Sequence, residues 1–133
     1  MKNYLKIIPV FLVVPFLLSC RNSIYVSKLM TYELGSTTKM GSGYISYSCQ
    51  KADGSATYHF TIKDNQSLIM TAKYTVELGA LTVTALDKDG AEIHHSIIVE
   101  DTEEQISFPD YGSYKIRVDL DEFKGTYRMD WKK

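Results

Sequence analysis

From Tyr44 to the end of the chain, apolar side chains recur at every second residue, and this period of two constrains the fold most. Such alternation predicts strands with one buried face, whereas an amphipathic helix repeats every 3.6 residues. β-branched and aromatic residues dominate these runs, and proline is absent from them, as strands prefer. The clearest runs are 58–62, 68–78, 81–85, 93–99, 114–120 and 127–131. We therefore expect an all-β chain.

Turn-like stretches separate these runs, and they favour an antiparallel arrangement. Residues rich in Asp, Gly, Asn and Pro stand at 51–55, 63–66, 87–90, 109–112 and 121–125. Short strands at this spacing predict an antiparallel β-sandwich whose last two strands form a hairpin around 121–125. The predicted core includes Phe60, Leu81, Val83, Ile97, Ile116, Val118, Met129 and Trp131.

The order of short motifs between residues 56 and 131 is similar to that of the bacterial pre-peptidase C-terminal domains and related jelly-roll modules. The motifs are Phe60-Thr-Ile62, Gly79-Ala-Leu-Thr-Val83, Leu86-Asp-Lys-Asp-Gly90, Ile106-Ser-Phe-Pro109, Tyr111-Gly-Ser-Tyr-Lys-Ile-Arg-Val118 and Gly125-Thr-Tyr-Arg-Met129. The resemblance implies a jelly-roll-like sandwich that binds or spaces and does not catalyse. These domains normally accompany an enzyme, and we expect no enzyme domain within these 133 residues.

The first nineteen residues have the plan of a secretory signal peptide. Lys2 and Lys6 form a positive start, and an apolar run from Ile7 to Leu18 follows, broken by Pro9 and Pro15. This run is shorter than the roughly 20 residues that a permanent membrane span needs. We expect residues 1–19 to be cleaved, residues 20–43 to form a tether with a possible first strand, and residues 44–133 to form the β-sandwich domain.

The end of the apolar run, Leu17-Leu18-Ser19-Cys20, resembles the lipobox of bacterial lipoproteins. The resemblance implies that Cys20 receives a diacylglyceryl group and becomes the first mature residue. Two or three acyl chains give stable anchoring. The protein is thus expected at the cell membrane or the outer membrane, lipid-anchored and facing outside the cytoplasm. An ordinary secretory signal is the alternative.

Charge argues against a nucleic-acid partner. Two of the 15 basic residues lie in the signal peptide, which leaves 13 basic and 16 acidic residues and a formal charge of −3. A mildly acidic domain has no electrostatic footprint for nucleic acid. The expected partners are the membrane, through Cys20, and an envelope protein or glycan.

Motifs for cofactors, metals and catalysis are sparse. There is no Walker loop, dinucleotide fingerprint or nucleophile elbow, so no cofactor and no enzymatic activity are expected. Asp87 and Asp89 have the first spacing of a calcium loop but lack its later ligands, so a hairpin turn is favoured over a metal site. His95 is expected on the buried face of its strand. Cys49 has no partner once Cys20 is acylated, and it is expected to be a small buried residue.

Tyrosine supplies the candidate binding residues. Aromatic planes stack on sugar rings, but most tyrosines fall on the inward face of their strand. Tyr44 and Tyr47, beside the linker-like segment 35–43, and Tyr111, in a turn, are the ones expected to be exposed. The favoured function is a non-enzymatic binding module of the envelope.

Three alternatives remain open. One is a small envelope hydrolase whose residues meet only in three dimensions, using His59 or His94 with loop carboxylates. The second is a purely structural envelope protein. The third rests on Tyr47-Ser48-Cys49, which is similar to the membrane-bound lysozyme inhibitors. Those proteins carry a second cysteine and an S-G-x-x-Y motif downstream, and this chain has neither after Cys49.

Overall fold

The structure, a computed structural model, describes residues 24–63 and 67–132. The expected signal peptide and Cys20 lie outside the described residues. The seven strands are β1 (Tyr25–Leu34), β2 (Thr37–Gly41), β3 (Tyr44–Ile62), β4 (Leu68–Leu86), β5 (Glu92–Ile98), β6 (Thr102–Phe108) and β7 (Gly112–Lys132). All pairings are antiparallel, and this part of the chain contains no helix, so none that could cross a membrane. The expected all-β antiparallel class is confirmed.

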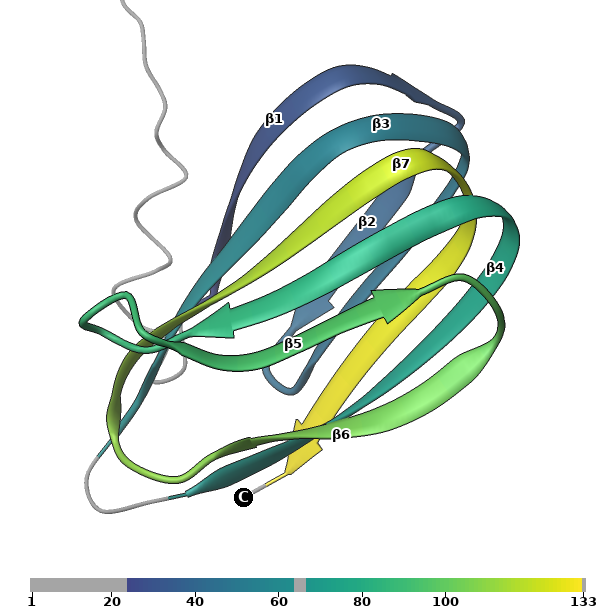
Figure 1. Ribbon diagram of the computed structural model, residues 1–133. Helices are drawn as coiled ribbons and strands as arrows, with labels where there is room; N and C mark the ends of the chain where they lie inside the picture. The colour runs from purple at the N-terminus through teal and green to yellow at the C-terminus, as the bar shows by residue number, and fades with distance from the viewer. Residues whose placement is uncertain (1–23, 64–66, 133) are drawn as a thin grey trace, which may run out of the picture.

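Three long strands, β3, β4 and β7, run through both layers of the molecule and curve over between them (Figure 1). Their first and second halves pair with different neighbours. The first layer holds β1, the second half of β3, the first half of β7, the second half of β4, and β5. The second layer holds β2, the first half of β3, the second half of β7, the first half of β4, and β6. One sheet is thus folded onto itself.

Bulges produce the bends between the layers. The β3–β7 register shifts between Cys49 and Gly54, and the β4–β7 register shifts between Val76 and Ala80. Extra residues of this kind bend a strand and increase its twist. Gly125 (φ 154°) lies at the bend of β7, where a Cβ atom would overlap the carbonyl oxygen of Thr75 on β4. Only glycine allows this close approach of two backbones.

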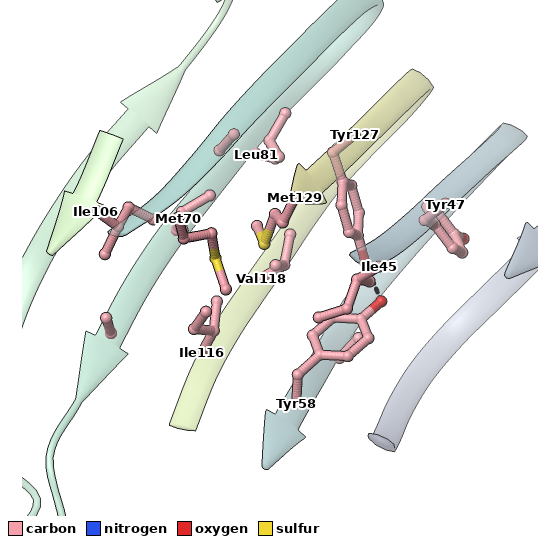
Figure 2. Packing of buried hydrophobic residues seen from close by; sticks show 14 of the residues in the cluster. Ile45, Tyr47, Tyr58, Met70, Leu81, Ile106, Ile116, Val118, Tyr127 and Met129 are labelled. Carbon is pink, nitrogen blue, oxygen red and sulfur yellow. Dashed lines mark hydrogen bonds between the residues drawn. The ribbon is translucent and has the colours of Figure 1, made fainter. Parts of the chain in front are cut away.

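The inward faces of the two layers form one continuous core (Figure 2). Phe60 of the first layer stacks on Trp131 of the second, with ring centroids 6.2 Å apart. The buried hydroxyl groups of Tyr58 and Tyr127 hydrogen-bond to each other at 2.6 Å. This pairing satisfies two polar groups that would be costly to bury alone. Seven of the eight predicted core residues are buried: Phe60, Leu81, Val83, Ile116, Val118, Met129 and Trp131.

The eighth, Ile97, is 66% exposed, so the prediction that it belongs to the core is wrong. On β5 it is His94, Ser96 and Ile98 that face inward, and His95 is on the outside, contrary to expectation. Isoleucines occur in both phases of this strand, so alternation alone does not select a face. The inward polar groups are accommodated because Glu104 of β6 accepts a hydrogen bond from Ser96 at 2.8 Å.

Two predicted turns are continuous strand instead. Residues 51–55 lie within β3 and residues 121–125 lie within β7, so the predicted terminal hairpin is wrong. The segment 35–43, expected to be linker-like, contains β2. The turns at 87–90 and 109–112 are confirmed, and a strand near Ile24 is confirmed as β1.

Candidate functional site

A groove of about 470 Å³ opens on the first layer, at the end away from the bends. Strands β1, β3 and β7 supply most of its walls, and the turn after β4 supplies the rest. The lining residues are Tyr25, His59, Phe60, Thr61, Asp87, Lys88, Ser113, Tyr114 and Lys115. Hydroxyl, ammonium and aromatic groups therefore meet in one open depression, the combination that ligand sites commonly show.

Strand register places three of these side chains in one row across the outer face. Tyr25 of β1 pairs with His59 of β3, and His59 pairs with Lys115 of β7. Residues directly opposite each other in antiparallel strands have Cβ atoms about 5 Å apart, so the three side chains are neighbours. The row brings together residues that are up to 90 positions apart in the sequence.

The Tyr25 and His59 rings form a flat aromatic pair at one side of the groove. Their centroids are 4.4 Å apart and their planes differ by only 5°. The hydroxyl group of Ser27 lies 3.2 Å from His59 Nε2 and fixes the orientation of the imidazole. Burial, and then the positive charge of Lys115, lowers the pKa of His59. This shift in the pKa favours the neutral form of the imidazole.

The groove carries an excess of positive charge. Its ionised side chains are Lys88, Lys115 and Asp87. In the described part of the chain, neither ammonium group has a carboxylate within 4.0 Å. Both ammonium groups are thus available to an anionic group of a ligand.

The Asp87 carboxylate is already used within its turn. Its Oδ1 atom accepts hydrogen bonds from the backbone N–H groups of Asp89 and Ala91, each at 2.9 Å. Gly90 completes the turn by donating its N–H to the Asp87 carbonyl at 3.0 Å. Among residues 24–63 and 67–132, no three His, Cys, Asp or Glu side chains are grouped to hold a metal ion. The geometry is that of the hairpin turn favoured from the sequence.

The three tyrosines proposed from the sequence do not come together. Tyr47 is 1% exposed and donates a hydrogen bond to Glu33 at 2.6 Å, so its expected exposure is wrong. Tyr44 lies in the second layer, partly covered by the Arg128 guanidinium group at 4.6 Å from its ring. Tyr111 is 54% exposed in the turn before β7, as expected. None of the three lines the groove.

The arrangement around His94 resembles a catalytic set but differs from one in a decisive way. His94 Nε2 lies 3.3 Å from Glu104 Oε2 and 3.4 Å from Ser96 Oγ. In a serine–histidine–acid triad the two partners use different ring nitrogens, so that one side of the imidazole takes a proton while the other is held. Here both partners share one nitrogen. Tyr74 also donates to Glu104, at 2.6 Å, so the cluster connects β4, β5 and β6.

Cys49 is free and buried, as expected, and its Sγ lies 3.4 Å from the carbonyl oxygen of Phe123. Burial raises the pKa of the thiol. A raised pKa decreases the thiolate fraction, and the thiolate is the reactive form. The surroundings of Cys49 are therefore those of a packed core residue and not of a reactive thiol.

Sequence reasoning missed Tyr25 and Lys115 as site residues. Tyr25 falls in the possible first strand of the segment 20–43, where no site residue was expected, and Lys115 looks like an ordinary polar residue on the exposed face of a strand. A usable signal was present in the run Ile24-Tyr-Val-Ser-Lys28, since β-branched and aromatic residues favour a strand with Tyr25 and Ser27 on one face.

The chain is similar to known proteins in fold but not in sequence. No family model matches the chain, and no curated protein matches it. Among solved structures, one similar chain is the carbohydrate-binding module TmCBM61 in complex with β-1,4-galactotriose, with a TM-score of 0.45 and 12% identity over 83% of this chain and 88% of that one. A carbohydrate-binding module of Cellvibrio mixtus lichenase 5A, in complex with cellotriose, has a TM-score of 0.40 and 15% identity over 77% of this chain and 87% of that one.

A third similar structure is the enzymatically active domain of tailspike protein 4 of bacteriophage CBA120. Its TM-score is 0.42 and its identity 14% over 80% of this chain, which spans 18% of the tailspike chain. All three TM-scores lie below 0.5, so these likenesses carry no conclusion on function.

Proposed function

We propose that this protein is a non-enzymatic binding module of the cell envelope, held outside the cytoplasm by lipid on Cys20, and that its groove binds a saccharide with an acidic group. The observation that carries the ligand proposal is the flat Tyr25–His59 pair beside two lysines in one groove. The anchor rests on the signal peptide and the lipobox-like residues 17–20.

Each part of the groove matches a part of such a ligand. The apolar face of a pyranose ring packs on an aromatic plane, and Tyr25 is 53% exposed, which leaves room for that contact. The Thr61 and Ser113 hydroxyl groups offer hydrogen bonds to ring hydroxyl groups. A carboxylate on the sugar pairs with Lys88 or Lys115 as a point charge.

We expect Tyr25→Ala to weaken binding of an oligogalacturonate about thirtyfold, since losing a central aromatic residue costs about 2 kcal/mol of binding free energy. The measurement is calorimetric titration of the full chain, purified from membranes in detergent. Tyr111→Ala is a matched control, because Tyr111 is 54% and Tyr25 53% exposed and only Tyr25 lines the groove. A loss with Tyr111→Ala and none with Tyr25→Ala contradicts the proposed site.

The preference for an acidic saccharide is tested by titrating a charged and a neutral oligomer under the same conditions. A neutral galactose oligomer of equal length is expected to bind up to about fivefold more weakly per lysine engaged, because an exposed ion pair contributes up to about 1 kcal/mol. The difference must shrink with added salt, which screens exposed charges. Turnover of either oligomer, lost in His59→Ala, would instead show that the protein is an enzyme.

We expect Cys20→Ala to leave the precursor unprocessed by the lipoprotein signal peptidase. The mature protein should partition into a detergent phase, because its acyl chains each bury many methylene groups at about 0.8 kcal/mol apiece. Mass spectrometry of the N-terminus checks both statements. A soluble mature protein that starts at a residue other than 20 contradicts the anchor.

A further inference from the structure

The groove lies at the end of the first layer where the described chain begins. Tyr25, which lines the groove, is the first residue of β1. Tyr25 pairs with His59 near the end of β3, and His59 pairs with Lys115 near the start of β7. Lys115 in turn pairs with Leu86, the last residue of β4, and the turn that carries Lys88 follows it. The groove and the start of β1 therefore share one end of the molecule.

The stretch of chain between the expected lipid anchor and the groove is very short. Tyr25 comes only five residues after Cys20. An extended chain covers at most about 3.6 Å per residue, so Tyr25 stays within about 18 Å of the acylated residue. Leu34, at the other end of β1, lies about 30 Å further along the strand, because a strand rises about 3.3 Å per residue. An anchor on Cys20 thus holds the groove end of the domain near the membrane surface.

The exposed tyrosines gather at this same end. Tyr25 is 53% and Tyr111 54% exposed. Tyr111 lies here because the next residue, Gly112, pairs with Ile62 at the end of β3. Tyrosine is enriched where proteins meet the boundary between lipid and water, since its ring is apolar and its hydroxyl group is polar. The side chains at this end therefore suit a position beside lipid headgroups.

Net charge does not draw this end to an anionic surface. The described lysines around the groove end are Lys63, Lys88 and Lys115, and the described carboxylates there are Asp87, Asp89, Glu92 and Asp110. Attraction to anionic lipid needs an excess of basic residues, and this end has none. Any contact with a membrane component must therefore be specific, and the groove is the feature that can provide it.

We propose that the saccharide in the groove is the headgroup of an acidic glycolipid in the same leaflet that holds Cys20. This inference rests on the proposed function, from which it takes the groove and the anchor, and adds that the ligand belongs to the membrane. One sugar ring on one aromatic pair binds weakly. A short tether compensates, because it raises the effective concentration of the headgroup to about the millimolar range.

Competition in vesicles tests the inference. The lipidated chain is placed in phosphatidylcholine vesicles that contain a diacylglycerol with a galacturonic acid headgroup, and a fluorescent oligogalacturonate is titrated from solution. We expect its apparent Kd to be at least about fivefold higher than in vesicles with the same fraction of phosphatidylglycerol, because the lipid headgroup occupies the groove. Phosphatidylglycerol has the same charge without the sugar, so it corrects for repulsion of the oligomer by the membrane.

A spacer variant tests the role of the short tether. About thirty residues of a helix-forming sequence, inserted between Asn22 and Ser23, move the groove up to about 45 Å from the anchor, at about 1.5 Å per residue. In this variant the acidic glycolipid should raise the apparent Kd less than about twofold, because the effective concentration of headgroups falls. The Kd in phosphatidylglycerol vesicles should stay that of the unchanged chain.

The outcomes separate this inference from the proposed function. Equal Kd values in the two kinds of vesicle, or the same increase with and without the spacer, would overturn the inference and leave the groove as a saccharide site. If the oligogalacturonate does not bind even in phosphatidylglycerol vesicles, the proposed function fails and this inference fails with it.

Discussion

Changing Trp131 to alanine is expected to lower the free energy of unfolding by about 3–5 kcal/mol, as for other large aromatic residues in protein cores. Trp131 is 8% exposed and stacks on Phe60 across the two layers, so its removal leaves a cavity between them. Urea unfolding followed by far-ultraviolet circular dichroism measures the loss, because the variant has no tryptophan left for fluorescence.

The same measurement on Tyr111→Ala provides the comparison. Tyr111 is an aromatic residue at 54% exposure, and its replacement should change stability by no more than about 0.5 kcal/mol. A loss below about 1 kcal/mol for Trp131→Ala would contradict the two-layer core.

Changing Gly125 to alanine is expected to cost about 2–6 kcal/mol, because two separate penalties add. The backbone angle φ of 154° strains an L-residue by about 1–3 kcal/mol. The new Cβ atom would also overlap the Thr75 carbonyl oxygen, and forcing β4 and β7 apart adds about 1–3 kcal/mol more. Thermal and urea unfolding of the variant check the sum.

Gly90 separates the two penalties. Its φ is 82°, yet a Cβ atom there would meet nothing within 4 Å. Gly90→Ala should therefore cost only the backbone strain, about 1–2 kcal/mol. If both variants lose the same free energy of unfolding, the close approach of β4 and β7 at the bend adds no penalty of its own.

The strands and most of the core follow from the sequence because each depends on local alternation. Phe60, Leu81 and Ile116 are buried as predicted, since each lies on the apolar face of a clear period-two run. Local pattern fails where a strand has apolar residues on both faces. Ile93 and Ile97 share one face of β5 and Ile98 lies on the other, and packing against β6 decides between them.

The bends were misread because the same residues suit a turn and a bulge. Asp53-Gly54 favours a hairpin turn, and glycine with positive φ is equally suited to a bulge in a continuous strand. Only the long-range pairing of β3 with both β1 and β7 decides the outcome. No local sequence pattern indicates that pairing.

The groove could not be predicted for a related reason. Tyr25, His59 and Lys115 become neighbours only through the β1–β3–β7 register. Nothing in the sequence near any one of them marks it as a site residue. Tyr47, which did look exposed beside a glycine-rich segment, is buried because β3 continues and turns its side chain inward to Tyr127, 5.0 Å away between ring centroids.

Amide chemical shifts of the labelled full chain, recorded while an oligogalacturonate is added, test the groove most directly. The largest changes are expected on the residues that line the groove from three strands and one turn, which are Tyr25, His59, Lys88, Ser113 and Lys115. Changes that cluster instead around Tyr44 and Arg128 in the second layer, or around Tyr111, would contradict this expectation, as would the absence of any change at saturating ligand.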